Sequence, residues 1–343
     1  MNVNEGNRNM SDTIILGIES SCDETAAAVV KNGRIVLSDI VNSQIGIHQH
    51  FGGVVPEVAS RKHIENIALV VDRAFTEAGL DYSAIDAVAV TNRPGLIGAL
   101  LVGLSFAKSF AYGLDVPLIA VNHLQGHVYA NFMEHEDIVF PAVCLIVSGG
   151  HTSLQLMNDR YSFATIGQTS DDAAGEALDK VARFLGLGYP GGPAIEKAAV
   201  PGTASTFKLP RVFLDRKNFD FSFSGLKTAA MNEWNKLVKQ GNPDLTAMVT
   251  EFQQALVDIL AVKAIRAARH YSCKTVMLAG GVACNQELRR RLREEADNIG
   301  IKAVYPSLKL CTDNAVMIAG CAYHDYRKQL FAPLDINAQA NLD

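Results

Sequence analysis

Two histidines, His123 and His127, stand four residues apart in Val121-Asn-His-Leu-Gln-Gly-His127. On a helix, this spacing places both side chains on one face, about 5–6 Å apart at Cβ, so that two imidazoles can bind one metal ion. The helical metalloprotease signature has Glu directly after the first His as general base, but this chain has Leu124 there. The pair therefore indicates either a metal site without a protease base or two histidines with structural partners.

Asp313, in Cys311-Thr-Asp-Asn314, is the candidate for a third metal ligand. It stands at the expected start of the last helix, where Asp is also a favoured N-cap residue. Two histidines and one carboxylate with open positions form an arrangement suited to Fe(II). We expect the histidines to come from one lobe and Asp313 from another, so that the metal would lie in a cleft.

Two pairs of adjacent glycines are candidates for anion binding. Ser148-Gly149-Gly150 lies between two expected strands, and Ala279-Gly280-Gly281 lies between a strand and a helix. Backbone N–H groups at such sites approach an anion closely, and a helix N-terminus favours negative charge. Each pair is equally compatible with a tight turn. Asn285 follows the second pair, where it suits either a ligand contact or a local cap.

The elements that position these residues occur in two similar series. The first series has expected strands at 13–19, 26–30 and 35–40, a helix at 56–78, a strand at 87–91, a helix at 96–112 and a strand at 116–122. The second has strands at 140–147, 153–157 and 161–166, helices at 172–185 and 245–271, strands at 275–278 and 301–305, and a helix at 313–326. Two three-stranded meanders, each followed by strand and helix units, predict a duplicated α/β fold of the actin-like ATPase (ASKHA) class, with two lobes and a ligand cleft.

The predicted division follows from this repeat. Residues 1–12 form a disordered tail, 13–135 the first lobe, 136–330 the second lobe with its last helix returning to the cleft, and 331–343 a C-terminal tail.

The composition is that of a soluble globular protein, with 343 residues of which 48% are hydrophobic and 20% charged. The net charge of -5 argues against general nucleic-acid affinity but leaves room for basic patches at 61–63 and 289–293. The six cysteines show no pairing motif, which predicts a reducing, cytoplasmic compartment. No uninterrupted apolar run is expected to reach the length of a bilayer.

A series of motifs, in this order, resembles one known family. They are Gly17-Ile-Glu-Ser-Ser-Cys-Asp-Glu-Thr25, Gly52-Gly-Val-Val-Pro-Glu57, Pro94-Gly-Leu96, His123-x-x-x-His127, Val147-Ser-Gly-Gly-His-Thr152, Asp171-Asp-Ala-Ala-Gly-Glu176, Tyr189-Pro-Gly-Gly192, Phe221-Ser-Phe-Ser-Gly225 and Cys311-Thr-Asp-Asn314. The chain closely resembles the bacterial TsaD family of tRNA N6-adenosine threonylcarbamoyltransferases from about Ile14 to Tyr326.

The resemblance implies transfer of a threonylcarbamoyl group from threonylcarbamoyl-AMP to N6 of the adenine 3′ of the anticodon, in tRNAs that read codons beginning with A. It implies one divalent metal, expected to be Fe(2+) with zinc as an alternative, held by His123, His127 and Asp313. It also implies partners: tRNA, a paralogous TsaB-type subunit and a TsaE-type small ATPase. The residues that it implies for adenylate binding are Ile146, Val147, Ser148, Gly149, Gly150, Asp179, Gly192, Glu196 and Asn285.

Two positions depart from the family pattern. Glu196 stands where many relatives have Asp, and Arg93 where relatives commonly have Gly. Because the adenylate is already an activated anhydride, no nucleophilic side chain is required, and no catalytic residue is assigned. Asp23 and Glu24 are candidate bases, although such an acidic turn is also compatible with a structural role.

Three other functions remain as alternatives. An ATP-dependent kinase or chaperone of the same fold would hold Mg²⁺ through carboxylates and phosphate, so the histidine pair argues against it. Leu124 argues against a zinc peptidase. A non-catalytic paralogue would have no need of the complete metal and glycine motifs.

Overall fold

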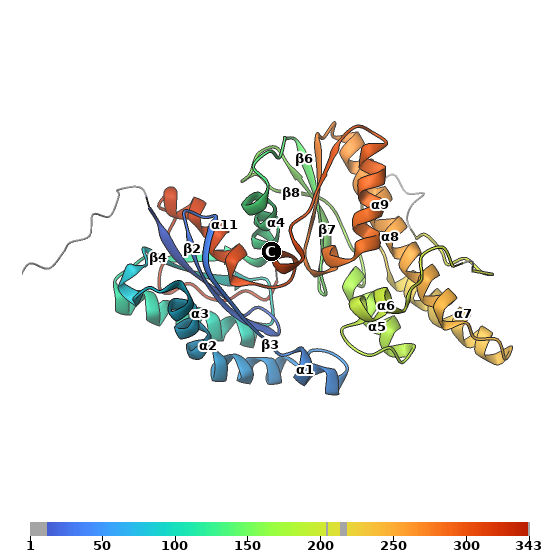
Figure 1. The fold of residues 1–343 in the computed structure, drawn as a ribbon, viewed down its shortest axis with the longest axis horizontal. Helices are drawn as coiled ribbons and strands as arrows, with labels where there is room; N and C mark the ends of the chain where they lie inside the picture. Colours follow the sequence, from blue (N-terminus) through green and yellow to red (C-terminus); the bar gives the residue numbers. More distant parts are fainter. Residues whose placement is uncertain (1–11, 204, 213–217, 342–343) are drawn as a thin grey trace, which may run out of the picture. The chain divides into compact units, whose positions relative to one another are not determined.

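Two five-stranded sheets with the same strand order form the framework of the protein (Figure 1). The computed structural model describes residues 12–203, 205–212 and 218–341. The first sheet, in the order β3-β2-β1-β4-β5, contains β1 (Ile14–Glu19), β2 (Glu24–Lys31), β3 (Ile35–Ser43), β4 (Ala87–Arg93) and β5 (Leu118–Asn122). The second, in the order β10-β9-β6-β7-β8, contains β6 (Ala142–Val147), β7 (Thr152–Met157), β8 (Ala164–Gln168), β9 (Thr275–Ala279) and β10 (Lys302–Val304).

Each sheet repeats one pattern of pairing. The first three strands of each series are antiparallel neighbours, and the fourth pairs in parallel with the first. The fifth strand then pairs in parallel with the fourth. The predicted duplication of a meander followed by parallel strands is therefore confirmed.

The chain divides into two compact units, each built on one sheet. The second unit comprises Ile45–Gly53 and Glu134–Thr312, and the first comprises the described parts of 1–44, 54–133 and 313–343. The predicted division placed the last helix in the second lobe. The structure instead groups it with the first unit, because α11 (Ala315–Arg327) packs against β1 and β2.

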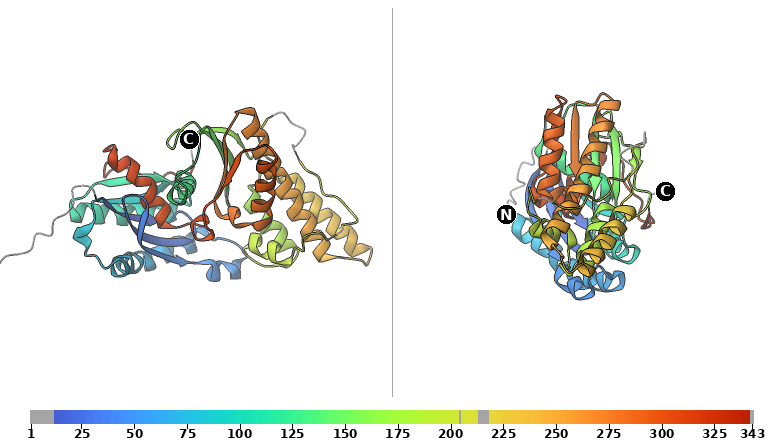
Figure 2. Two further views of the ribbon diagram at one scale, coloured as in Figure 1. Left: turned by 45° about the horizontal axis from the view of Figure 1, so that its top comes forward. Right: turned by 90° about the vertical axis from the view of Figure 1, so that its right-hand side faces the viewer.

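Successive side chains along β1 point to opposite faces of the first sheet. Leu16 and Ile18 belong to a core shared with α2 (Pro56–Ala78) and α3 (Ile97–Leu114). Gly17 faces the other way, toward α11, because successive strand residues point to opposite faces. A Cβ at Gly17 would lie 2.3 Å from the carbonyl oxygen of Ala315, so only glycine permits this close approach. Figure 2 shows α11 beside the first sheet in a turned view.

The remaining elements of the first unit follow the sheet order. A short turn of 3-10 helix, η2 (Tyr82–Ala84), precedes β4, and α4 (His123–Glu134) begins directly after β5. The described part of the predicted C-terminal tail packs on this unit: Ala332 pairs with Leu118, and the N–H of Gln339 donates to the Asn92 carbonyl at 2.9 Å. The predicted N-terminal tail lies, apart from Asp12, outside the described residues.

The second unit also contains nine helical segments within its described residues. They are α1 (Ile45–His48), η1 (Gln49–Phe51), α5 (Ala174–Phe184), α6 (Gly191–Ala198), α7 (Ser224–Lys239), α8 (Leu245–His270), η3 (Gly281–Cys284), α9 (Gln286–Asp297) and α10 (Leu308–Cys311). The core of this unit includes Phe221, Phe223 and Phe252. In the Gly- and Pro-rich segment before residue 193, α6 begins at Gly191. Packing against α5 and α8 supports this helix despite its poor propensity.

Two helices bear on the expectation that no apolar run reaches the length of a bilayer. By length and composition alone, α3 and α8 would suffice to cross a membrane. In α8, 61% of the apolar window is buried inside the protein, as in a core helix. In α3 the buried share is 33%, and its inner side contributes to the core with α2 and the first sheet. Both helices thus have packing partners within their own units.

Candidate metal centre

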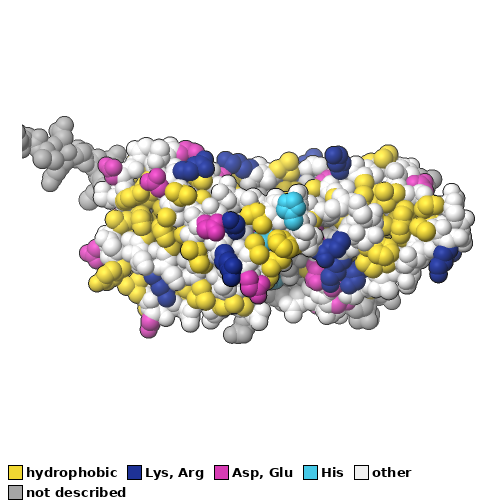
Figure 3. Space-filling view, turned by 90° about the horizontal axis from the view of Figure 1, so that it is seen from below, with side chains coloured by type: hydrophobic (Ala, Val, Ile, Leu, Met, Phe, Trp, Pro, Cys, Tyr) yellow, Lys and Arg dark blue, Asp and Glu magenta, His cyan; other side chains and the backbone are white. Residues whose placement is uncertain are grey.

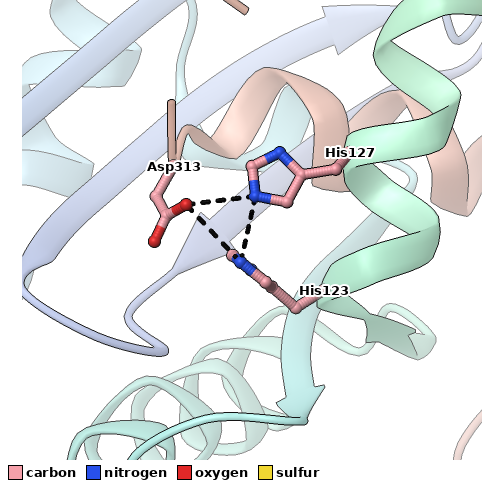
Figure 4. Close-up of side chains that lie close together, drawn as sticks. All are labelled: His123, His127 and Asp313. Atoms are coloured by element: carbon pink, nitrogen blue, oxygen red, sulfur yellow. Dashed lines mark hydrogen bonds and ion pairs between the residues drawn. The ribbon is translucent and has the colours of Figure 1, made fainter. Parts of the chain in front are cut away.

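The side chains of His123, His127 and Asp313 converge within the first unit (Figure 4). The two histidines occupy the first two turns of α4, and Asp313 lies just before α11. The N-cap of α11 is Asn314, whose side chain accepts a hydrogen bond from the N–H of Met317 at 2.8 Å. Asp313 is therefore not the helix cap, and its carboxylate points to the histidines.

The three ligand atoms form a triangle of a size that fits one ion. The Nε2 atoms of the two histidines are 3.1 Å apart, and Asp313 Oδ1 lies 3.1 Å from His127 Nε2 and 3.5 Å from His123 Nε2. Metal bonds of about 2.0–2.2 Å at tetrahedral or octahedral angles place neighbouring ligand atoms roughly 3–3.5 Å apart. Two imidazole nitrogens and one carboxylate oxygen are also a donor set for a divalent transition metal.

Glu19 fixes the orientation of His123 from behind. Its carboxylate oxygen Oε2 lies 2.9 Å from His123 Nδ1, while it also accepts a hydrogen bond from the Thr91 hydroxyl at 2.6 Å. The other oxygen accepts from the Ser21 N–H at 2.5 Å, and Glu19 is fully buried. A carboxylate at Nδ1 holds that proton and leaves the lone pair of Nε2 free for a metal.

Glu19 was not among the residues predicted to form the site. A signal was present, because an acidic residue ends the otherwise apolar strand Ile14–Glu19. Alternation places Glu19 on the same face of β1 as Gly17, the face covered by α11. His127 has no comparable support: its Nδ1 is buried and has no hydrogen-bond partner among the residues that the structure describes.

The charges of the centre shift the pKa values of its members in opposite directions. Burial opposes the charged form of His123, but the carboxylates of Asp313 and Glu19 outweigh it and raise its pKa. Burial and the neighbouring His123 lower the pKa of His127. Burial also penalises the Asp313 carboxylate, but the two histidines lower its pKa overall. In the metal-free centre, the carboxylates thus favour protonation of His123, and His123 in turn disfavours protonation of His127.

The candidate bases Asp23 and Glu24 lie in the same unit, where β1 leads into β2. Burial, followed by the negative charges of Asp313 and Asp23, raises the pKa of Glu24 to about 9. Its carboxyl group accepts a hydrogen bond from the Ser43 hydroxyl at 3.0 Å. In the metal-free protein Glu24 is therefore protonated at neutral pH, so it does not act there as a ready proton acceptor.

The first predicted glycine segment lies at the end of β6. The turn after Val147 contacts the start of α5, where a Cβ at Gly175 would lie 2.5 Å from the Ser148 carbonyl oxygen. Gly280 has φ of +89°, and a Cβ there would lie 2.5 Å from the Val147 carbonyl oxygen. The structure thus brings 146–150 together with the second glycine pair and a helix N-terminus, all in the second unit.

The other predicted adenylate-binding residues form a second group around α6 and α9. Asp179 accepts a hydrogen bond from the Gly191 N–H at 2.6 Å, next to Gly192. Glu196 accepts from the Gln286 N–H at 2.7 Å, which links α6 to the residue after Asn285. Asn285 caps α9, because its side chain accepts a hydrogen bond from the Leu288 N–H at 2.9 Å. The local cap considered for Asn285 is therefore present.

The predicted basic run on α9 is largely neutralised. Arg290 pairs with Glu287 and Glu294, and Arg291 with Glu295. Arg289 is buried. Figure 3 shows one face of the molecule, not identified with α9, on which Lys and Arg side chains are interspersed with acidic and apolar ones. The ion pairs of this run and the burial of Arg289 therefore argue against a nucleic-acid patch on α9.

Comparison with known proteins gives a family match over most of the chain. Residues 35–320 match the family model described as "TsaD: tRNA N6-adenosine threonylcarbamoyltransferase". A relative of that name from Syntrophomonas wolfei is 66% identical over 97% of this chain and 98% of its own length. The relative of the same name from Bacillus subtilis is 51% identical over 97% of this chain and 96% of its own length.

Solved structures with little sequence identity share the fold. Component A of the (R)-2-hydroxyglutaryl-CoA dehydratase of Acidaminococcus fermentans superposes with a TM-score of 0.56 at 14% identity, covering 93% of this chain and 99% of that chain. Full-length HypF superposes with a TM-score of 0.60 at 16% identity, covering 95% of this chain and 47% of that chain. The predicted actin-like ATPase fold is confirmed.

Proposed function

Because the chain belongs to the TsaD family of tRNA N6-adenosine threonylcarbamoyltransferases, we propose that its histidine and aspartate centre holds one divalent metal for this reaction. The protein is a transferase that modifies tRNA. The observation that supports the metal is the triangle of His123, His127 and Asp313 with separations of 3.1, 3.1 and 3.5 Å. Fe(2+) is the ion that we propose, because two histidines and one carboxylate with open positions suit it.

When bound, such an ion supplies Lewis-acid chemistry and a template for oxygen ligands. The protein's own part is to hold the donor atoms. Glu19 keeps the Nδ1 proton of His123, and Asn314 caps α11 so that Asp313 remains free to bind. Leu124, at the position of the protease's general base, is buried and apolar. Among the described residues, position 124 therefore supplies no carboxylate to activate water as the protease's Glu does.

We propose threonylcarbamoyl-AMP as the donor and N6 of the adenine 3′ of the anticodon as the acceptor, in tRNAs that read codons beginning with A. The residues proposed to bind the adenylate are Ile146, Val147, Ser148, Gly149, Gly150, Asp179, Gly192, Glu196 and Asn285. Support comes from the glycine turn at the N-terminus of α5, where backbone N–H groups favour negative charge. An anticodon-loop base would have to leave its stack to present the amine.

We further propose a TsaB-type subunit and a TsaE-type small ATPase as partners, with a cytoplasmic location. Exposed apolar side chains on α2 and α3, among them Ile64, Leu69 and Ile97, support a protein partner. All six cysteines are free, which fits a reducing compartment.

The decisive experiment is incubation of the protein and its proposed partners with threonylcarbamoyl-AMP and unmodified tRNA. Nucleoside mass spectrometry should detect threonylcarbamoyladenosine, and removal of metal by a chelator should abolish it. His270→Ala provides a matched control, since this histidine is exposed at the end of α8 and should leave activity unchanged. Modification at the wild-type rate by metal-free protein would refute the role of the metal.

A further inference from the structure

The C-terminal segment 332–340, which we call the clasp, packs on the first unit. Ala332 donates its N–H to the carbonyl oxygen of Leu118 in β5 at 2.8 Å. The side chain of Ile336 packs against the core of this unit, and Lys108 of α3 donates to the Ile336 carbonyl oxygen. Contacts with β5, α3 and the core thus hold the first part of the clasp in place.

The end of the clasp binds an irregular stretch of backbone. The pairing of β4 with β5 skips Asn92, which is the extra residue of a β-bulge. The carbonyl oxygen of Asn92 accepts a hydrogen bond from the Gln339 N–H at 2.9 Å. The N–H of Gly95 donates to the Ala340 carbonyl oxygen at 3.1 Å. The clasp therefore holds the bulge at two points of its backbone.

The bulge supports both groups that lie behind His123. Just before it, the Thr91 hydroxyl donates to Glu19 Oε2 at 2.6 Å. Just after it, the Leu96 N–H donates to the Ser21 carbonyl oxygen at 2.8 Å. Glu19 Oε2 and Ser21 Oγ lie 2.9 and 3.2 Å from Nδ1 of His123. The clasp thus binds the backbone between two contacts that lead to the same proposed metal ligand.

Close packing connects the bulge to Ser21. A Cβ at Gly95 would lie 2.6 Å from the Ser21 carbonyl oxygen, so the two backbones are in direct contact. Ser21 and Asn92 are both buried. Because a protein interior is close-packed, a displacement of the bulge shifts its neighbours instead of being taken up by empty space.

We propose that the clasp is a positioning element of the metal centre. By holding the bulge, it keeps Glu19 and Ser21 at Nδ1 of His123, so that Nε2 of the same ring faces the other two ligands. The inference rests on the metal proposed above, since the outer partners of a ligand act on metal affinity.

Arg93 adds a contact of the same kind at the protein surface. This position departs from the family pattern, and its guanidinium donates to Gln339 Oε1 at 3.2 Å. Both residues are exposed, so water competes for this hydrogen bond. We expect Gln339→Ala to have only a small effect, and Gln339→Glu, which retains an acceptor for Arg93, to behave like the wild type.

Gln339→Pro tests the clasp, because proline removes the N–H that Asn92 accepts. A chain that ends after Ala338 lacks both backbone contacts and is the second variant. Leu334→Pro is the matched control, since Leu334 is exposed and is the second residue of the turn from Pro333, a position that favours proline. Thermal melts show whether each variant is folded.

Hydrogen exchange of the metal-free full chain, measured by mass spectrometry, reports the position of the bulge without any metal. In Gln339→Pro and in the shortened chain, peptides that cover residues 19–25 and 91–96 should exchange faster than in the wild type. Peptides from β6 in the second unit and from α2 should keep their wild-type rates. Leu334→Pro should exchange like the wild type throughout.

Titration with Zn²⁺ against a chromophoric chelator measures the consequence for the metal. Gln339→Pro should bind Zn²⁺ about tenfold more weakly, the lower end of the effect of losing an outer partner. The visible absorption of bound Co²⁺ should also change, because it depends on the arrangement of the ligands. Gln339→Glu and Leu334→Pro should stay within about twofold of the wild type.

Three results would overturn the proposal. They are wild-type exchange at 19–25 in both variants, faster exchange in α2 as large as that at 19–25, and wild-type Zn²⁺ affinity despite faster exchange at 19–25. The second result would mean that the clasp contributes only to the stability of the whole unit. If the wild type itself binds no Zn²⁺, the proposed metal is refuted, and faster exchange confined to 19–25 and 91–96 still supports the clasp as the support of His123.

Discussion

Replacing Glu19 by Gln removes the negative charge behind His123 while keeping the shape of the side chain. In the wild type, Glu19 is fully buried and its Oε2 lies 2.9 Å from His123 Nδ1. Gln retains one acceptor oxygen, but its amide group cannot replace the charge that holds the Nδ1 proton. We therefore expect the His123 ring to lose both its fixed tautomer and part of its basicity toward a metal.

Loss of such an outer partner typically reduces metal affinity by about 10–100-fold, which corresponds to about 1.4–2.7 kcal/mol of binding free energy. The complete burial of Glu19 favours the upper part of this range, because water cannot take the place of the carboxylate. Two further hydrogen bonds, from Thr91 and Ser21, also hold Glu19 in one position.

The assay is a competitive titration of metal-free protein with Zn²⁺ against a chromophoric chelator, which needs no transferase activity. Glu65→Gln is the matched control, because Glu65 is exposed on α2 and pairs only with Lys62 among the contacts that the structure describes. Thermal melts show whether Glu19→Gln remains folded. Metal affinity within about twofold of the wild type, in a folded Glu19→Gln protein, would refute the role of Glu19.

Other substitutions test the remaining parts of the centre. His127→Ala and Asp313→Ala should each abolish bound metal, measured by elemental analysis, and transferase activity; an Asp313→Ala protein that keeps its metal would show that Asp313 is no ligand. Gly17→Ala places a Cβ 2.3 Å from the Ala315 carbonyl oxygen, so it should cost about 1–3 kcal/mol in denaturant unfolding and weaken metal binding by shifting α11. Glu24 has a folded-state pKa of about 9 against 4.5 ordinarily, so its ionisation destabilises the metal-free fold increasingly as pH rises between these values. The melting temperature of Glu24→Gln minus that of the wild type should therefore increase as the pH rises from about 5 to about 9. If the melting temperatures of the two proteins depend equally on pH, the raised pKa of Glu24 is contradicted.

Most of what could be predicted came from patterns within short stretches of the sequence. The alternation and apolar runs of the strands identified both meanders, and the spacing of His123 and His127 placed them on one helical face. Contacts between residues far apart in sequence were harder to predict. The hydrogen bond of Glu19 to His123 spans 104 residues, and the acidic end of β1 marks Glu19 without identifying its partner.

Helix ends show the same limit. Asp313 and Asn314 are both good N-cap residues, and only the structure shows that Asn314 caps α11. The start of α6 was not predicted, because tertiary packing overrides the poor helix propensity of Gly191 and Gly192. The last helix was assigned to the second lobe since chain order suggested it, whereas the sheet it covers is the first.

The return of the chain to its first unit has a consequence for biosynthesis. A ribosome completes β1 and α4 long before it reaches Asp313, which lies 186 residues after His127. Until then the nascent first unit has two histidines but no carboxylate from Asp313, and the face of β1 around Gly17 remains uncovered. Domains generally fold as they emerge, but this one can be completed only after the second unit has been synthesised. Its metal should therefore be acquired late, close to release of the finished chain.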